Sequence, residues 1–393
     1  MRTVQMYSFH FLCARIQKTI YPSFNSKLRM FLDRRRVLIF SCLVTLVTQS
    51  FAQEKQYYFF HSNNYGSDAL FNPISLLANG GWDTRQDIDR QLWSHHYWNI
   101  ASTNVWRSVR SPFSIIKSYG WSRFARKEIF PISFTTDNAE GLSNLMLHTI
   151  GGGMEYRKIS EWYDYSGVPV PYIFGIITNV AYEFFNEVVE NGPNYYPNID
   201  CIPDILLFQP LGIILFSFNN ISSFFSSTLN MNDWSEIAAV SLSPFAIQNA
   251  GQNFVMKLAL NQEKSTSIFF HFGDFAIFGF SFKTDAESAV SIGAGIASTG
   301  VKQLPIQNKV PSNTVTIGPT AGVYYDRNNS LLASVVYSDN WDTRFRVNIY
   351  PGLLSSSSFS PGLFVALRGD ITPTIGLTIR ILPLGICFSS IDR

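Results

Sequence analysis

The sequence predicts an all-β transmembrane barrel of about ten to twelve antiparallel strands, with an α-helical insertion in its lumen or at its periplasmic mouth. Three observations predict this class. Apolar and polar residues alternate through the C-terminal third, an export signal lies near the N-terminus, and only 15% of residues are charged while 15% are aromatic. Soluble domains carry about 25% charged residues. Few charges, many aromatics and alternating strands are typical of outer-membrane barrels.

Residues 1–52 are predicted to be a signal region. Three arginines precede an apolar run of about eleven residues (37–47), and Ser50 and Ala52 supply the small residues that a signal peptidase requires. We expect Met30 to be the true start and cleavage to follow Ala52. The apolar run is shorter than the about 20 residues that cross a bilayer. Sec-dependent export and strands that form a barrel together indicate the outer membrane of a Gram-negative bacterium.

Charge and cysteine content narrow the class of partner. The chain holds 30 Lys/Arg and 28 Asp/Glu, of which the first 52 residues hold eight and one, so the mature part is acidic by about five charges. This balance excludes nucleic acid as an expected partner. Cys201 and Cys387 are the cysteines that remain, too few for a disulfide framework. We expect no metal and no cofactor. The expected partners are outer-membrane lipid and the barrel-assembly machinery, with the oligomeric state left open.

Residues 53–137 are predicted to be an N-terminal strand and loop region. The aromatic run 57–60 is a candidate for the first strand, and 127–135 is a candidate for another. Between 65 and 123 the apolar residues show no clean period, which is typical of a rim or periplasmic segment.

Residues 138–230 are predicted to be the helical insertion. Apolar residues recur at helical spacing in 142–163, and further helices are expected at 172–190, 203–218 and 222–229. Pro171 suits a helix first turn, and the Asn-Gly-Pro sequence at 191–193 ends that helix. None of these runs reaches the about 20 apolar residues of a membrane span without a charge or a proline.

Residues 231–393 are predicted to supply most of the barrel strands. The chain is expected to return to the barrel at 240–253. In 343–350, Phe345, Val347 and Ile349 share one face while polar residues share the other, and this period of two indicates a strand. Four arginines on the polar faces or strand ends are expected to line the lumen as an electropositive strip: Arg344, Arg346, Arg368 and Arg380. The strand candidates are 253–261, 268–283 (one long strand or a hairpin at 273–274), 288–298, 314–325, 331–338, 343–350, 362–368 and 373–382.

The helical insertion also carries a concentrated set of polar residues. Carboxylates in apolar helices need partners, and Arg157 is the expected counter-ion of Glu183. His148 and Glu183 are candidates for a general acid–base pair, but we favour a structural polar clamp over a ligand or lipid-headgroup site and over a catalytic one. The set consists of His148, Tyr156, Arg157, Glu183, Glu187, Asp200 and Asp204.

The order of these residues resembles an uncharacterised family of Gram-negative outer-membrane β-barrel proteins. The family carries a His/Tyr-Arg helix, a Glu-Phe-Phe-x-Glu helix and an Asn…Asp helix ahead of its strands; the segment is also faintly similar to VanZ-like membrane proteins. The resemblance implies a membrane location and a barrel, and it implies no established activity. The residues that carry the resemblance are His148, Gly152-Gly153, Tyr156-Arg157, Glu183-Phe184-Phe185-Asn186-Glu187, Asn198, Asp204 and Pro210-Leu211-Gly212. Two positions depart from the family: Asn186 stands where glycine is usual, and Pro210-Leu211-Gly212 replaces a glycine pair.

Three functions follow from this sequence. The first is a non-enzymatic envelope protein that acts as a solute channel, handles lipid or has a structural role. The second is an envelope enzyme that modifies lipid or glycan with His148 and Glu183. The third is a helical inner-membrane protein similar to VanZ, against which the β-periodic C-terminal half argues.

Overall fold

The computed structural model describes residues 56–82, 95–130, 145–191, 199–242, 245–273, 275–303, 313–340, 343–354 and 359–389. The compact unit treated below is Tyr57–Arg393. The predicted signal region, with its start at Met30 and its cleavage site at Ala52, lies outside the described residues.

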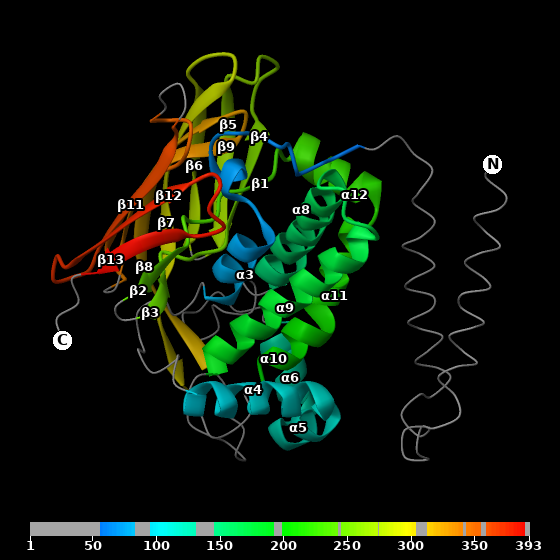
Figure 1. The fold of residues 1–393 in the computed structure, drawn as a ribbon. Helices are drawn as coiled ribbons and strands as arrows, with labels where there is room; N and C mark the ends of the chain where they lie inside the picture. Colours follow the sequence, from blue (N-terminus) through cyan, green and yellow to red (C-terminus); the bar gives the residue numbers. More distant parts are fainter. Residues whose placement is uncertain are drawn as a thin grey trace. The chain divides into compact units, whose positions relative to one another are not determined.

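A large mixed sheet of thirteen strands forms the framework (Figure 1). Its spatial order is β1-β4-β5-β6-β7-β8-β9-β10-β11-β12-β13-β2-β3. The strands are β1 (Asn232–Asp233), β2 (Ala239–Leu242), β3 (Phe245–Gln248), β4 (Asn253–Ala259), β5 (Thr266–Gly273), β6 (Phe275–Lys283), β7 (Ser288–Gln303), β8 (Asn313–Arg327), β9 (Ser330–Ser338), β10 (Phe345–Ile349), β11 (Pro361–Leu367), β12 (Pro373–Ile379) and β13 (Gly385–Ser389).

The strand prediction needs two corrections. The sheet has thirteen strands instead of ten to twelve, because β1, β2 and β3 are two to four residues long and carry little periodicity. The predicted sheet was antiparallel throughout, but β13 pairs with β2 in parallel, through Ile386 and Val240. This parallel pair joins strands far apart in sequence, which no local pattern specifies. Among the described residues no pairing joins β3 back to β1.

Two strands bury polar side chains and expose apolar ones, the reverse of a water-soluble sheet. In β12, Thr374, Gly376 and Thr378 are buried, whereas Ile375 and Leu377 are exposed. The same holds in β10, where Arg346 and Asn348 are buried between less buried apolar neighbours. The predicted alternation is therefore present in these strands, and the face that points into the molecule carries polar groups beside a buried apolar cluster from other strands.

Helices make up the other half of the unit. The helices predicted for the insertion are present. They are η5 (Leu145–Gly151), α8 (Gly152–Tyr165), α9 (Pro171–Asn191), α10 (Cys201–Pro203), η6 (Asp204–Phe208), α11 (Gln209–Phe216), α12 (Asn219–Ser223) and η7 (Phe224–Thr228). Upstream of them lie η1 (Ser67–Leu70), α3 (Pro73–Gly81), α4 (His95–Arg110), α5 (Pro112–Tyr119), α6 (Trp121–Phe124) and η3 (Ala125–Ile129).

The predicted strands of the N-terminal region are wrong where the structure describes them. Residues 57–60 form no strand, because the Glu161 carboxylate accepts the backbone N–H groups of Tyr58, Phe59 and Phe60 that a strand would donate. Residues 127–129 belong to the helical turn η3, and 131–135 lie outside the described residues. Helix α3 begins at a capping box on Asn72 followed by proline, a local start signal.

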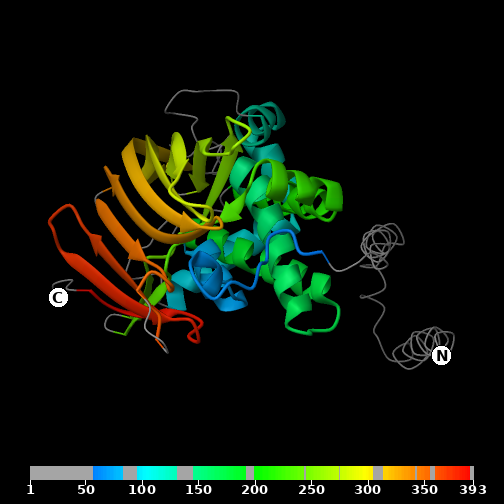
Figure 2. The same cartoon turned by 90° about the horizontal axis from the view of Figure 1, so that it is seen from above.

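The helices lie on the open side of the curved sheet, as Figure 2 shows from above. At one edge, the backbone N–H of Lys257 on β4 bonds to the carbonyl of Leu229 behind η7 (2.8 Å). Asn79 of α3 donates to the Glu236 carbonyl and accepts from the Gly251 N–H, in the segments just after β1 and just before β4, and the neighbouring Gly80 lies against α9. Helical elements therefore contact the sheet at β4 and at the segments next to β1 and β4.

No single described helix is long and apolar enough to cross a membrane. By length and composition alone, one pair passes the same test together: Cys201–Phe216 and Asn219–Thr228, bent by 86° at their junction.

Candidate functional site

His148 lies between two carboxylates at the junction of η5, α9 and η6. Its Nδ1 is 3.0 Å from Glu183 and its Nε2 is 4.0 Å from Asp204. All three side chains are buried. Burial opposes a charged imidazole, but the Glu183 and Asp204 carboxylates outweigh it and raise the pKa of His148 to about 10. The histidine is therefore an imidazolium held between two acids.

Further carboxylates surround this group. Glu187, one turn beyond Glu183 on α9, is buried, and its two oxygens accept no hydrogen bond from the residues that the structure describes. Asp200, just before α10, is buried next to Glu128 of η3, whose carboxylate accepts a 2.5 Å bond from Tyr119. Burial first, and the Asp200 charge second, raise the pKa of Glu128 to about 7. The junction is thus rich in buried acid.

Arg157 is not the partner of Glu183 that the sequence predicted. Its Nε donates to Glu161 one turn further along α8 (2.8 Å), a second nitrogen donates to Asn219, and the guanidinium lies over the Tyr58 ring at 4.9 Å. Tyr156, also in the predicted set, is buried and accepts a 3.3 Å bond from Ser217. Both side chains therefore belong to a separate network that holds the segment 57–60.

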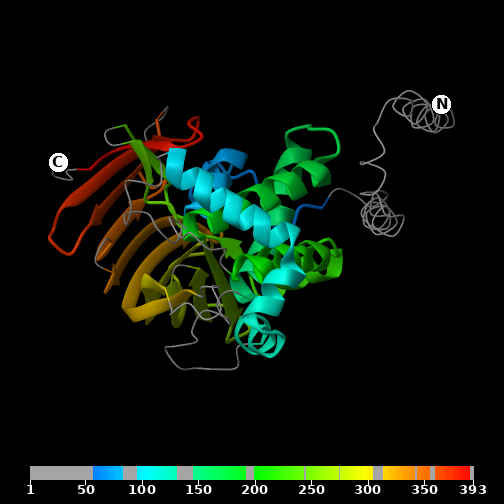
Figure 3. The same cartoon turned by 90° about the horizontal axis from the view of Figure 1, so that it is seen from below.

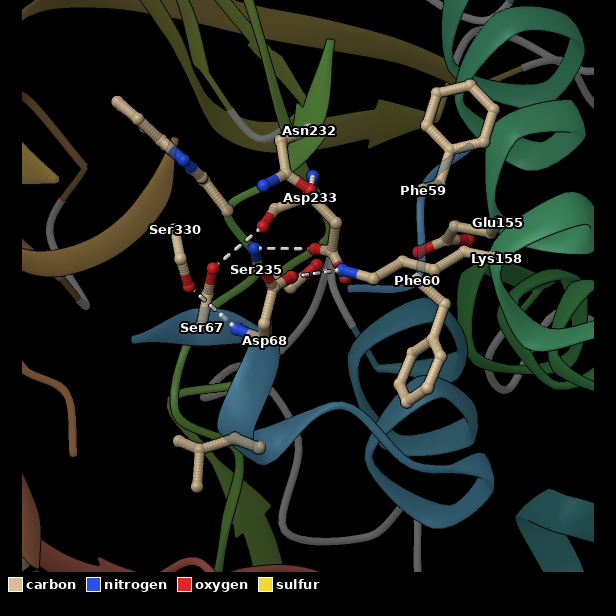
Figure 4. Close-up of polar contacts among 12 residues, drawn as sticks. Phe59, Phe60, Ser67, Asp68, Glu155, Lys158, Asn232, Asp233, Ser235 and Ser330 are labelled. Atoms are coloured by element: carbon tan, nitrogen blue, oxygen red, sulfur yellow. Dashed lines mark hydrogen bonds and ion pairs between the residues drawn. The ribbon is translucent and has the colours of Figure 1, made fainter. Parts of the chain in front are cut away.

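A second buried ionic group joins the helices to the sheet, shown in Figure 4. Lys158 of α8 is fully buried, and its ammonium donates to Asp68 of η1 (2.9 Å) and to Asp233 of β1 (3.3 Å). Burial opposes the charge on Lys158, but Asp233 and Asp68 outweigh it and raise its pKa. Ser330 of β9 bonds to the N–H of Asp68 and so continues this group into the sheet.

The inner face of the sheet holds ion pairs of its own. Lys257 pairs with Asp326 at 2.5 Å, and Arg346 pairs with Glu236 at 3.0 Å. Asn348 donates to Glu236 and accepts from Asn249, both buried. Each of these charged side chains therefore has a protein partner of opposite charge.

The predicted electropositive strip is not formed. Arg346 alone of the four arginines is deeply buried, and the carboxylate of Glu236 neutralises it. Arg344 is half-buried and lies 3.7 Å from Asp339. Arg368 is half-buried and Arg380 is exposed at the end of β12. The last two lie at or beyond strand ends, so side-chain parity did not decide their position.

Two cavities border these networks. One of about 30 Å³ lies where α3 meets the β1–β2 segment, with Asn79, Glu155, Asp233 and Glu236 in its lining. It has room for one or two waters. A larger one, about 380 Å³, lies at the strand ends beside the turns of β4, β6 and β8, with Lys257, Lys264, Lys283, Glu287 and Asp326 in its lining.

The polar groups around His148 are buried and contact one another. No three His, Cys, Asp or Glu side chains among the described residues are arranged to hold a metal ion. His148 and Glu183 contact each other, but neither borders either of the two cavities. A proton-transfer pair needs a substrate within hydrogen-bond reach. The site is best described as a buried polar clamp between helices.

Sequence reasoning missed Asp68, Lys158, Asp233, Glu236 and Lys257. One signal was available: Lys158 lies within the helix that recurring apolar residues predict over 142–163, and a buried cation requires acids nearby. The identity of those acids had no local signal, since Asp68 and Asp233 lie 90 and 75 residues away.

Comparison of the chain with family models, with curated proteins and with solved structures finds no match.

Proposed function

We propose that this chain is a non-enzymatic outer-membrane protein of the Gram-negative envelope. Its curved sheet faces lipid with its apolar surface, and charged networks and helices fill the space on the polar side. In this proposal the protein has a structural or lipid-handling role and does not form an open channel. The reversed sheet is the observation that carries it.

Strand β6 illustrates the reversal. Phe278, Phe280 and Phe282 lie on the outer face, and Phe278 is 60% exposed, while Ile277 and Ser281 on the inner face are buried. Similar exposed apolar residues continue across the neighbouring strands, among them Ile268, Ile292, Ile296, Val323, Val335, Ile375, Leu377 and Ile386. A soluble monomer rarely exposes a contiguous apolar patch above about 300–600 Å². A hydrocarbon solvent accounts for an apolar outer face and a polar inner one.

The helices repeat the pattern. On α9, Ile173, Phe174, Ile177 and Val180 are exposed on one face. The opposite face buries polar side chains that bond across the helix interface, with Asn179 donating to the Gly152 carbonyl and accepting from Gln209. Exposed apolar residues also lie along η6 and α11: Leu206, Leu207, Leu211 and Ile214. Lipid would cover these faces as it covers the sheet.

The filled interior favours a closed protein. Lys158, Lys257 and Arg346 all point to the polar side of the sheet, and each is buried in an ion pair with protein carboxylates. An open channel leaves such charges hydrated. The buried ion pairs therefore support a protein whose interior is packed and not open to solvent.

The test is an arginine substitution on the outer face. Phe278→Arg should destabilise the protein by about 2–4 kcal/mol if the position lies near the bilayer midplane. In a water-soluble protein the same change at an exposed site stays within about 0.5 kcal/mol. Lys283→Arg, at the end of the same strand, is the matched control. Stability is measured by denaturant unfolding in lipid vesicles, alongside fractionation of cell envelopes and heat-modifiable gel migration.

If Phe278→Arg is neutral and the chain is recovered outside the outer-membrane fraction, the proposal is wrong.

A further inference from the structure

Helices α4 to η3 carry a surface of exposed aromatic and basic side chains that the proposed function does not use. We define this aromatic–basic surface by Trp106, Arg107, Arg110, Phe113, Lys117, Trp121, Arg126 and Lys127, all of which are exposed. Phe113 is 73% exposed and Trp121 is 53% exposed. Between His95 and Phe130 the chain has six Lys/Arg and one acid, Glu128, which is buried. The surface is therefore cationic as well as aromatic.

The aromatic and basic side chains are interleaved. Trp106 and Arg110 are four residues apart on α4, and Phe113 and Lys117 are four apart on α5, so each pair lies on one helix face. The Phe113 and Trp121 rings lie 6.2 Å apart, which brings the faces of α5 and α6 together. Long basic side chains beside aromatic rings keep a charged head in water above an apolar body.

An incomplete core does not explain why these aromatic side chains are exposed. The inner sides of α4, α5 and α6 already form a buried cluster from Ala101, Val105, Ile116, Tyr119 and Phe124, which packs against Val188 of α9 and Ile202 of α10. The exposed rings point away from that cluster. Their exposure needs an explanation outside this helical group.

The position of the surface indicates the partner. Helix α4 packs on the C-terminal part of α9, at the end of the helical unit seen in Figure 3. The exposed apolar residues of α9 end at Val180, so the helix continues for eleven residues, or about 16 Å, beyond them. In the membrane orientation of the proposed function, on which this step rests, α4 to η3 lie at the level of the headgroups.

We propose that the aromatic–basic surface binds the headgroups of anionic phospholipids. Trp and other aromatic rings gather at membrane–water interfaces. Amphipathic helices rich in Lys and Arg bind anionic lipid electrostatically while their aromatic and apolar side chains enter the boundary. The five basic residues Arg107, Arg110, Lys117, Arg126 and Lys127 face phosphate groups, and Trp106, Phe113 and Trp121 insert beside the acyl chains.

Photo-crosslinking of the full-length chain in lipid vesicles tests the proposal. The photoreactive residue p-benzoylphenylalanine replaces Phe113, and tagged phosphatidylglycerol or tagged phosphatidylcholine reports lipid contact. Phe278 is the position for the sheet's outer face, and Glu263, in the exposed β4–β5 turn, is the water-facing control. Arg107→Gln, Arg110→Gln and Lys117→Gln together remove charge at exposed positions without disturbing the buried cluster.

We expect position 113 to label phosphatidylglycerol in preference to phosphatidylcholine, and the triple Gln variant to lower that labelling at least about fivefold. Labelling at 278 without labelling at 113 overturns this inference and leaves the proposed function intact. Labelling at 113 without labelling at 278 supports the inference and overturns the proposed function. Equal labelling by the two lipids, or a protein adduct in place of a lipid adduct at 113, overturns the inference.

Discussion

Single buried charges in this protein are held by several partners at once. Lys158 has two carboxylates within 3.3 Å, and Glu161 accepts three backbone N–H groups as well as the Arg157 guanidinium. A buried charge costs several kcal/mol when it leaves water, and only close partners offset that cost. At the scale of one residue, stability therefore depends on complete polar groups.

Removing Lys158 should expose this dependence. Lys158→Met leaves Asp68 and Asp233 buried without their cation, which typically costs about 3–5 kcal/mol. Denaturant unfolding measures the loss, with Lys264→Met at an exposed position as the control. Adding Asp68→Asn and Asp233→Asn to Lys158→Met should recover part of the stability. An unchanged unfolding midpoint for Lys158→Met would contradict the assignment.

The raised pKa of Glu128 predicts that the stability of the folded protein depends on pH. Its folded pKa of about 7 lies above the ordinary 4.5, because of burial first and Asp200 second. The folded state thus binds the proton more tightly than the unfolded state. The contribution is fully present below about pH 4.5 and is lost as the pH rises through about 7.

Glu128→Gln should therefore flatten the decline of Tm between these two pH values. Thermal unfolding followed by circular dichroism checks it, with the exposed Glu263→Gln as the control. Parallel pH profiles for the wild type and Glu128→Gln would contradict the prediction, because they would show that folding does not shift the pKa of the Glu128 carboxyl.

At the scale of elements, α8 and α11 approach each other through glycines. A Cβ on Gly153 would lie 2.7 Å from the Gly212 carbonyl oxygen and 2.5 Å from the Phe216 ring, and one on Gly212 would lie 2.4 Å from the Thr149 carbonyl oxygen. Backbone atoms cannot move aside as a flexible side chain can. The close contact of these helices therefore depends on both glycines.

Gly153→Ala should destabilise the unit by about 1–3 kcal/mol through overpacking, although alanine is the better helix former. Chemical unfolding provides the measurement, and Ser118→Ala on the exposed face of α5 is the control. A stabilised Gly153→Ala protein would mean that the two helices lie further apart than described.

At the scale of the whole molecule, the polar sides of the sheet and of α8 meet in one interior. Glu155 of α8 bonds to Gln252 just before β4, and Arg346 of β10 pairs with Glu236 before β2. Side chains from both the helices and the sheet therefore form hydrogen bonds and ion pairs in this interior. A protein built this way has little room for solute passage.

We therefore predict no steady ion conductance when the full-length protein is inserted into planar lipid bilayers. Insertion is checked by protease protection of the same bilayers or vesicles, so that a silent recording is informative. A stable single-channel current would contradict the filled interior and favour a solute channel.

Local patterns carried much of the fold. The alternation of Ile375 and Leu377 with threonine and glycine located β12, and apolar spacing with Pro171 at the start located α9. These features depend on neighbours within a few residues, so the sequence alone contains them. Local signals were also available for α3, where Asn72 and Pro73 mark the start, although the surrounding segment was predicted to be strand and loop.

The identity of partners was decided by the tertiary structure alone. The placing of Asp204 beside His148, the pairing of Arg157 with Glu161 in place of Glu183, and the pairing of β13 with β2 all depend on how elements pack. The sequence established which residues were polar in apolar surroundings and therefore needed partners. Which acid reached which base depended on helix rotation and sheet curvature, and these arise only when segments distant in sequence come into contact.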